Sequence, residues 1–224
     1  YARPQFLPAG TRIAFEFVYD NSSDNPHNPH HPARRVTYGE HTTDEMAELW
    51  LQVVTRNAAD RARLAQAVRE RIVREQIVGV EKRLETDPDN ATLHDDVALL
   101  HAEAGHLDGT VEHFAQTVRV RPDSPAARYN LGNALFRQGR HAEAIESLKA
   151  ALALRPDYAL AHDGLGVALY AQGKIAEATE HYRRAVQLDP ENTEARTHLV
   201  IALRRLLVIN PNLEGIKREL ADLE

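Results

Sequence analysis

The chain has 224 residues, a formal net charge of −6, no cysteine and a single methionine. The absence of cysteine excludes disulfides, a thiol nucleophile and cysteine-ligated metal centres. The acidic balance argues against a nucleic-acid partner, which would require a basic face, and no apolar run reaches the ~20 residues of a membrane-spanning helix.

The first 56 residues predict a partial β segment. Residues 12–19 are rich in β-branched and aromatic residues and follow a Pro-Ala-Gly turn, so they predict a short strand. Residues 20–32 consist almost entirely of turn formers and predict a loop. Three histidines of this loop are candidate ligands of a transition metal, because imidazole suits zinc, copper and nickel: His27, His30 and His31.

The same stretch contains Pro-Ala-Gly-Thr at 8–11, Tyr-Asp-Asn-Ser at 19–22 and Thr-Thr-Asp-Glu-Met at 42–46. Over residues 5–55 it resembles the C-terminal end of the copper type II, ascorbate-dependent monooxygenases. That resemblance implies that Met46 would ligate the oxygen-activating copper in an intact parent protein. The family's His-x-His pair is absent from this chain, so we expect no cofactor and no enzymatic activity here.

We therefore expect the chain to be the C-terminal part of a larger protein, with any copper held only in the full-length parent. The resemblance and the lack of cysteine both favour an extracytoplasmic or secreted location.

Residues 57–90 predict a linker and capping helix. Apolar residues recur at helical spacing over 58–86, and Pro88 ends the pattern. The apolar positions are Leu64, Ala67, Val68, Ile72, Ile77, Val80 and Leu84.

A 34-residue period follows. Prolines recur at 88, 122, 156 and 190, and glycines at 105, 139 and 173. Leu131-Gly132 matches Leu165-Gly166 at the same interval, and Ala144 matches Ala178. This pattern resembles the tetratricopeptide repeat (TPR) family over residues 58–224, with three full repeats at 91–124, 125–158 and 159–192.

The first repeat is degenerate, with Val97-Ala98 in place of Leu-Gly and Thr110 in place of alanine. The small residues should allow the two helices of a repeat to pack closely, and the period-matched glycines should adopt positive φ in the turns. Residues 193–224 predict C-terminal capping helices, interrupted at 210–212. The predicted fold is thus mostly α: a TPR solenoid with capping helices and a short N-terminal strand and loop segment.

The resemblance implies that first helices line a concave groove through repeat positions 5, 9 and 12. Aromatic residues there would anchor a partner, and an amide could pair with a peptide backbone. The predicted groove residues are Asp95, Leu99, Tyr129, Asn133, Phe136, Asp163, Val167 and Tyr170. Tyr129 and Asp163 stand where a basic clamp for a chaperone tail would need lysine, so we expect no such clamp. Alternatively, these residues pack against neighbouring repeats or a terminal segment.

Three functions follow as hypotheses. The first is a non-enzymatic interaction scaffold that assembles with itself, since the unlike ends of a solenoid permit head-to-tail oligomers or filaments. The strand at 12–19 would then pack on the solenoid or pair with a neighbouring subunit. The second is the end of a copper monooxygenase whose other ligands lie upstream. The third is an adaptor that binds a peptide in its groove.

Overall fold

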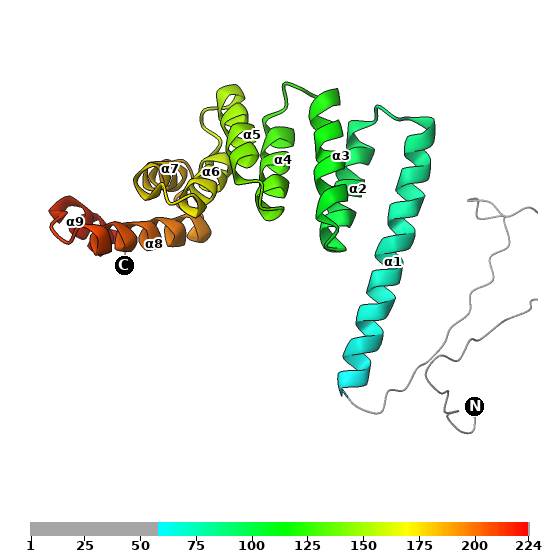
Figure 1. Ribbon diagram of the computed structural model, residues 1–224, viewed down its shortest axis with the longest axis horizontal. Coiled ribbons are helices and arrows are strands. Elements are labelled where there is room, and N and C mark those ends of the chain that lie inside the picture. Colours follow the sequence, from blue (N-terminus) through cyan, green and yellow to red (C-terminus); the bar gives the residue numbers. More distant parts are fainter. Residues whose placement is uncertain (1–57, 224) are drawn as a thin grey trace, which may run out of the picture. The chain divides into compact units, whose positions relative to one another are not determined.

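The computed structural model describes residues 58–223 (Figure 1). The predicted strand at 12–19, the loop histidines His27, His30 and His31, and Met46 lie outside the described residues. They remain predictions, as does the resemblance over residues 5–55.

The regular structure of the described residues consists of nine α-helices without a strand. None of these helices is both long and apolar enough to cross a membrane. A single helix α1 precedes three helix pairs and two final helices, which confirms the predicted solenoid with capping helices. Their bounds are α1 Ala58–Thr86, α2 Ala91–Glu103, α3 Leu107–Val120, α4 Pro125–Arg137, α5 His141–Leu154, α6 Ala159–Ala171, α7 Ile175–Leu188, α8 Thr193–Ile209 and α9 Glu214–Leu223.

The turn inside each helix pair depends on glycine. Gly105, Gly139 and Gly173 have φ values of 75°, 83° and 79°, as the period predicts. Backbone in this region costs an L-residue about 1–2 kcal/mol, whereas glycine adopts it freely. Each repeat therefore reverses direction at the same place.

A side-chain cap recurs at the start of three helices, whereas α6 begins after Tyr158 without a side-chain cap. Asn90, Ser124 and Asn192 accept hydrogen bonds from backbone N–H groups in the first turns of α2, α4 and α8, which satisfies donors that the helix itself leaves unpaired.

A second capping device recurs at the fourth repeat position, where the side chain lies 2.8–3.0 Å from the carbonyl oxygen of the proline six residues earlier. Histidine and arginine alternate at this position: His94, Arg128, His162 and Arg196.

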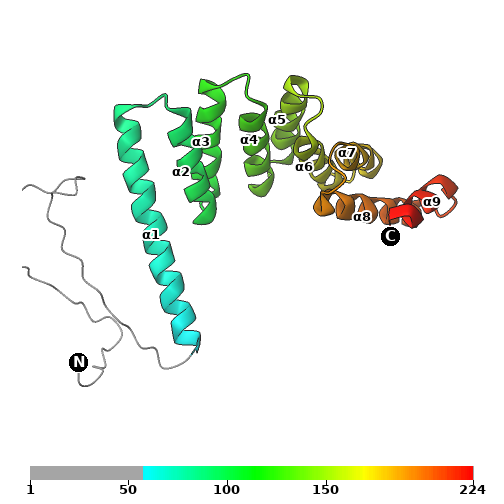
Figure 2. The same ribbon diagram turned by 180° about the vertical axis from the view of Figure 1, so that it is seen from behind.

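Small residues allow the paired helices to approach. Gly132 lies against Leu148, and Gly166 lies against the ring of Tyr182. Leu148 and Tyr182 are almost fully buried in one continuous core that runs from α5 to α8. Consecutive helices from α2 to α9 contact one another, and α4 also contacts α6 while α6 contacts α8 (Figure 2).

Helix α1 uses only part of its apolar surface. Val73, Ile77 and Leu84 are buried, and Leu84 packs with Leu93 and Val97 of α2. Two residues of the predicted stripe, Val68 and Ile72, are each 49% exposed. Because α1 has 29 residues and α2 only 13, not every apolar position of α1 has a helix to cover it.

The last helix, α9, contacts the main core only through partly buried side chains. Ile216, Leu220 and Leu223 are partly buried against the main core, but no residue of α9 is fully buried. Arg183 of α7 donates two hydrogen bonds of 2.7 Å to the two carboxylate oxygens of Glu219. This bidentate ion pair fixes the orientation of α9.

Candidate functional site

A hollow of about 260 Å³ lies between the first helices of successive repeats, α4 and α6, and the capping helix α8. We call it the polar hollow. It gathers five of the predicted groove residues with five others: Tyr129, Asn133, Phe136, Asp163 and Val167, together with Leu160, Gly164, Asn192, Glu194 and His198.

A second hollow of about 240 Å³ adjoins it and is mostly apolar. We call it the apolar hollow. It shares Phe136, Val167 and His198 with the polar hollow, and its other lining residues are Tyr170, Ala171, Tyr182 and Ile201. A bound chain could therefore place a polar group in one hollow and an apolar side chain in the next.

The strongest polar contact of the site joins α8 to α6. His198 Nδ1 lies 2.8 Å from Asp163 Oδ1, and the His198 ring packs on Tyr182 with centroids 5.4 Å apart. The hydrogen bond to Asp163 raises the pKa of His198 despite partial burial, and Glu194 adds to the effect. The imidazolium form is thus favoured beside the carboxylate.

Tyr129 experiences the same acidic surroundings. Burial is the main cause that raises the pKa of its phenol, and Tyr158, Asp163 and Glu194 raise it further, against a hydrogen bond with Asn133 that lowers it. The phenol therefore stays protonated at neutral pH and can donate a hydrogen bond. Within the described residues, no lysine or arginine lines the polar hollow, so the charge that it presents is negative, partly offset by His198.

Two predicted groove residues lie elsewhere. Asp95 accepts a 2.8 Å hydrogen bond from Thr117 Oγ1 of α3, so its carboxylate is engaged within the first repeat. Leu99 is 59% exposed and lines a different hollow, which includes Gln76 and Val80 of α1.

The contribution of α8 was not predicted. Extending the 34-residue period by one step places Glu194 and Ile201 at the positions of Leu160 and Val167, so sequence could have indicated these two. His198 aligns with Gly164, Asn130 and Asp96, so the period allows a polar side chain there but does not indicate a histidine. Only the contact with Asp163 identifies it.

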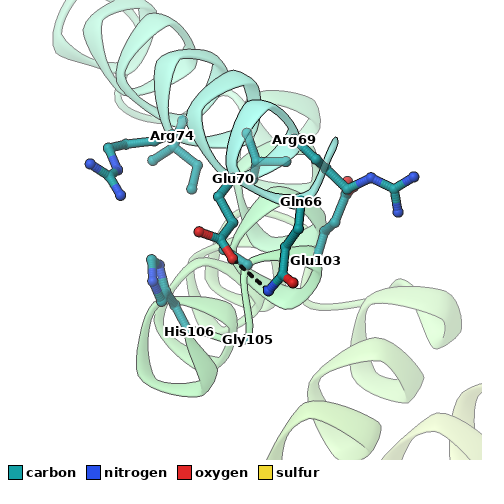
Figure 3. A pocket seen from close by; sticks show the side chains of 10 residues that line it. Gln66, Arg69, Glu70, Arg74, Glu103, Gly105 and His106 are labelled. Atoms are coloured by element: carbon teal, nitrogen blue, oxygen red, sulfur yellow. Dashed lines mark hydrogen bonds between the residues drawn. The ribbon is translucent and has the colours of Figure 1, made fainter. Parts of the chain in front are cut away.

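A further hollow of about 440 Å³ lies between α1 and the turn that joins α2 to α3. Gln66 donates a 2.9 Å hydrogen bond to Glu70 on its rim, while Arg69 and Arg74 point to opposite sides (Figure 3). The predicted groove residues, all of which fall in the part of the chain that the structure describes, do not line it.

Comparison with known proteins identifies the repeats. Family models described as TPR repeat and tetratricopeptide repeat match residues 132–173 and 159–192, respectively. No curated protein is similar to the chain at a significant level. The matches show that these residues form TPRs, as the period predicts.

Solved structures with the same fold span most of the described residues. The crystal structure of MamA is 22% identical, with a TM-score of 0.59 over 76% of this chain and 92% of MamA. The first TPR domain of human RPAP3 is 26% identical, with a TM-score of 0.52 over 56% of this chain and 98% of that domain. The first TPR of Spaghetti (RPAP3), bound to the HSP90 peptide SRMEEVD, is 27% identical with a TM-score of 0.50, over 52% of this chain and 92% of that one. These similarities do not bear on the copper monooxygenase resemblance, which stays a prediction.

Proposed function

We propose that this chain is a non-enzymatic protein-interaction scaffold that binds an extended segment of a partner protein across the polar and apolar hollows. The observation that carries the proposal is the convergence of groove residues from α4 and α6 with α8 in one hollow. The RPAP3 TPR, which has the same fold, is bound to a peptide. No cofactor is required for this role.

The charges of the polar hollow indicate the chemistry of the partner. Asp163 and Glu194 favour a lysine or arginine side chain, which can form charge-assisted hydrogen bonds with carboxylates. Asn133 and the protonated Tyr129 can hydrogen-bond a peptide backbone. An aliphatic or aromatic side chain two or three positions away would fill the apolar hollow, where Tyr170 and Ile201 lie.

This chemistry differs from that of the peptide in the RPAP3 complex. Its sequence, SRMEEVD, contains three acidic residues, which the carboxylates of the polar hollow would repel. We therefore propose a basic and apolar segment, not an acidic tail.

Selection of random seven-residue peptides on the whole chain tests the proposal. Selected peptides should be enriched in lysine or arginine near an apolar residue. Asp163→Asn should weaken their binding about tenfold or more, because charged contacts in a desolvated hollow are often hot spots. Glu146→Gln is the matched control, since Glu146 is an exposed carboxylate of α5 outside both hollows. Enrichment of acidic peptides, or equal effects of the two substitutions, would contradict the proposal.

Self-association is a second candidate function, and the distribution of exposed apolar residues favours it. Among the described residues, six of the nine large apolar side chains that are at least 40% exposed lie on α1 and α8, near the two ends of the array: Val68, Ile72 and Val78 on α1, and Ile201, Val208 and Ile209 on α8. Unlike ends that each expose apolar surface can associate head to tail. Val208 and Ile209, which are adjacent in sequence, are 70% and 64% exposed.

Sedimentation velocity from micromolar to millimolar concentration tests this second candidate. The wild-type chain should form larger species as concentration rises, and Val208→Lys with Ile209→Lys should shift it toward monomer. Leu154→Lys is the control, because Leu154 is 40% exposed on α5 inside the array. A chain that stays monomeric throughout would rule out self-assembly.

The copper monooxygenase hypothesis and the secreted location also remain proposals. They are supported by the motif at 42–46 and the lack of cysteine. An upstream reading frame with a His-x-His pair would support them, and its absence from the parent gene would refute the monooxygenase origin.

A further inference from the structure

Three helices of the N-terminal half bring metal-ligating side chains together. Glu81 of α1, His101 of α2 and His113 of α3 each offer a ligand atom, and these atoms lie within 4.8 Å of one another. His101 Nε2 is 3.7 Å from Glu81 Oε1. The rings of His101 and His113 are stacked, with centroids 5.5 Å apart and 14° between their planes.

Hydrogen bonds assign the proton of His113. His94 Nε2 lies 3.0 Å from the carbonyl oxygen of Pro88; a carbonyl only accepts, so this nitrogen carries the proton. When His94 carries this single proton, its other nitrogen can only accept, and it faces His113 Nδ1 at 3.0 Å. His113 must then donate from Nδ1, which leaves the lone pair on its Nε2.

This arrangement matches the usual support of a metal-bound histidine. Such a ligand donates its second ring N–H to a neighbouring acceptor, which fixes the tautomer and the ring orientation.

Packing against Gly109 also fixes the position of the His101 ring. A Cβ atom at Gly109 would lie 2.8 Å from His101 Cγ and Nδ1, so the ring occupies space that only glycine leaves open. The ring is therefore held against α3, with Nε2 directed at Glu81. Donor atoms around a tetrahedral zinc ion lie about 3.3 Å apart, so the three ligand atoms would move closer together on binding, and the exposed Glu81 side chain can rotate to do so.

A second pair of hydrogen-bonded histidines occurs elsewhere in the array, without the additional ligands of the first. Two periods later, His162 and His181 have the same Nδ1–Nδ1 distance of 3.0 Å, and His162 Nε2 lies 3.0 Å from the Pro156 carbonyl. The positions equivalent to Glu81 and His101 are Lys149 and Leu169. The hydrogen-bonded histidine pair thus occurs in both repeats, whereas the additional ligands, His101 in the first repeat and Glu81 in α1, have no counterpart beside the second pair.

We propose that Glu81, His101 and His113 bind a divalent transition metal ion such as Zn²⁺, with His94 as the positioning residue for His113. Two imidazoles and one carboxylate suit zinc, which would keep a water as its fourth ligand. The ion would fasten α1 to the first helix pair. Its three ligands are not among the residues that line the polar and apolar hollows.

Zinc titration of the full chain against a fluorescent chelator tests the site. The double substitution His101→Ala and His113→Ala should abolish one equivalent of bound zinc. The control, His162→Ala and His181→Ala, should retain that equivalent. Because the chain has twelve histidines, the comparison of the two variants, not the total stoichiometry, decides the result. Equal loss in both variants, or loss in neither, would overturn the proposal.

Glu81→Gln provides a variant that should not disturb folding, since Glu81 is exposed. It should weaken zinc binding about tenfold or more. In the wild type, zinc should slow backbone hydrogen exchange over residues 73–86, because the ion joins α1 to α2 and α3, and Glu81→Gln should lose this effect. Exchange that does not respond to zinc in the wild type would refute the proposed link.

His94→Arg isolates the positioning role. Arginine occupies the equivalent positions 128 and 196 and still donates to the proline carbonyl, but it offers no acceptor to His113. Zinc affinity should fall about 10–100-fold with little change in melting temperature, and ¹⁵N spectra should show that His113 no longer keeps its proton on Nδ1. His162→Arg should change neither zinc affinity nor the His113 tautomer. Unchanged zinc affinity in His94→Arg would exclude the positioning role.

Discussion

Replacing Gly166 with alanine should destabilise the chain, although alanine is the better helix former. An alanine in a helix interior normally gains about 1 kcal/mol over glycine. At this position, however, a Cβ atom would lie 2.6 Å from Tyr182 Cε1 and 2.7 Å from Tyr182 Cδ1. Tyr182 is only 3% exposed and also packs on His198, so moving its ring would disturb these contacts.

The two effects can be compared. Overpacking a dense core costs about 1–3 kcal/mol, so the net loss for Gly166→Ala should be about 1 kcal/mol after the gain in helix propensity. For a domain of this size that corresponds to a melting temperature lower by about 2–4 °C. Thermal unfolding followed by circular dichroism measures it directly.

Gly79→Ala is the matched comparison. Gly79 lies inside α1, and a Cβ atom added there would have nothing within 4 Å of it, so the substitution should raise stability through helix propensity alone. If Gly166→Ala also raised the melting temperature, the close approach of α6 and α7 would not be the reason for glycine. In a double-mutant cycle, Tyr182→Ala should remove most of the cost of Gly166→Ala.

Three further predictions concern the turns, the site and the last helix. Gly139→Ala should cost about 1–2 kcal/mol, since its φ is 83°; calorimetry should show a lower melting temperature, and an unchanged one would contradict the argument. His198→Gln should remove a pH-dependent contribution: because the folded pKa of His198 is raised above 6.5 by Asp163, that contribution is fully present below pH 6.5 and is lost as pH rises through the raised value. Urea unfolding at several pH values should show the wild type losing its advantage over the variant as pH rises, and a constant difference would be evidence against it. Arg183→Met should accelerate hydrogen exchange of α9 by removing its bidentate bond to Glu219, whereas exchange at the wild-type rate would show that apolar contacts alone hold the helix.

The solenoid could be predicted from sequence because its determinants are local and periodic. The positive-φ glycines and the small residues at 132 and 166 each have a fixed place in a 34-residue unit. The residues that they contact in the structure therefore belong to the same repeat. The bounds of α1 follow from its apolar spacing in the same way. The spacing within α1 does not show which of its apolar residues are buried, because burial depends on how far the shorter α2 extends along it.

The site could be predicted only in part. The period placed Tyr129, Asn133 and Val167 on the same face of successive first helices, and they do line one hollow. It could not show that Asp95 would accept a hydrogen bond from Thr117 or that His198 would pair with Asp163. Both contacts depend on single side chains, Thr117 and His198, whose equivalents in neighbouring repeats are different residues. The cluster of Glu81, His101 and His113 likewise draws one residue from each of three helices.

The polar hollow has walls from α4, α6 and α8, so it extends over three successive units of the array. In a solenoid, the small rotation between neighbouring units determines the curvature of the whole. A segment bound across Tyr129 and Glu194 would hold these helices at fixed separations and resist bending there. Binding of the proposed segment would therefore stiffen this part of the array, bending of the array would in turn alter affinity, and the hollow would then couple mechanical load to recognition.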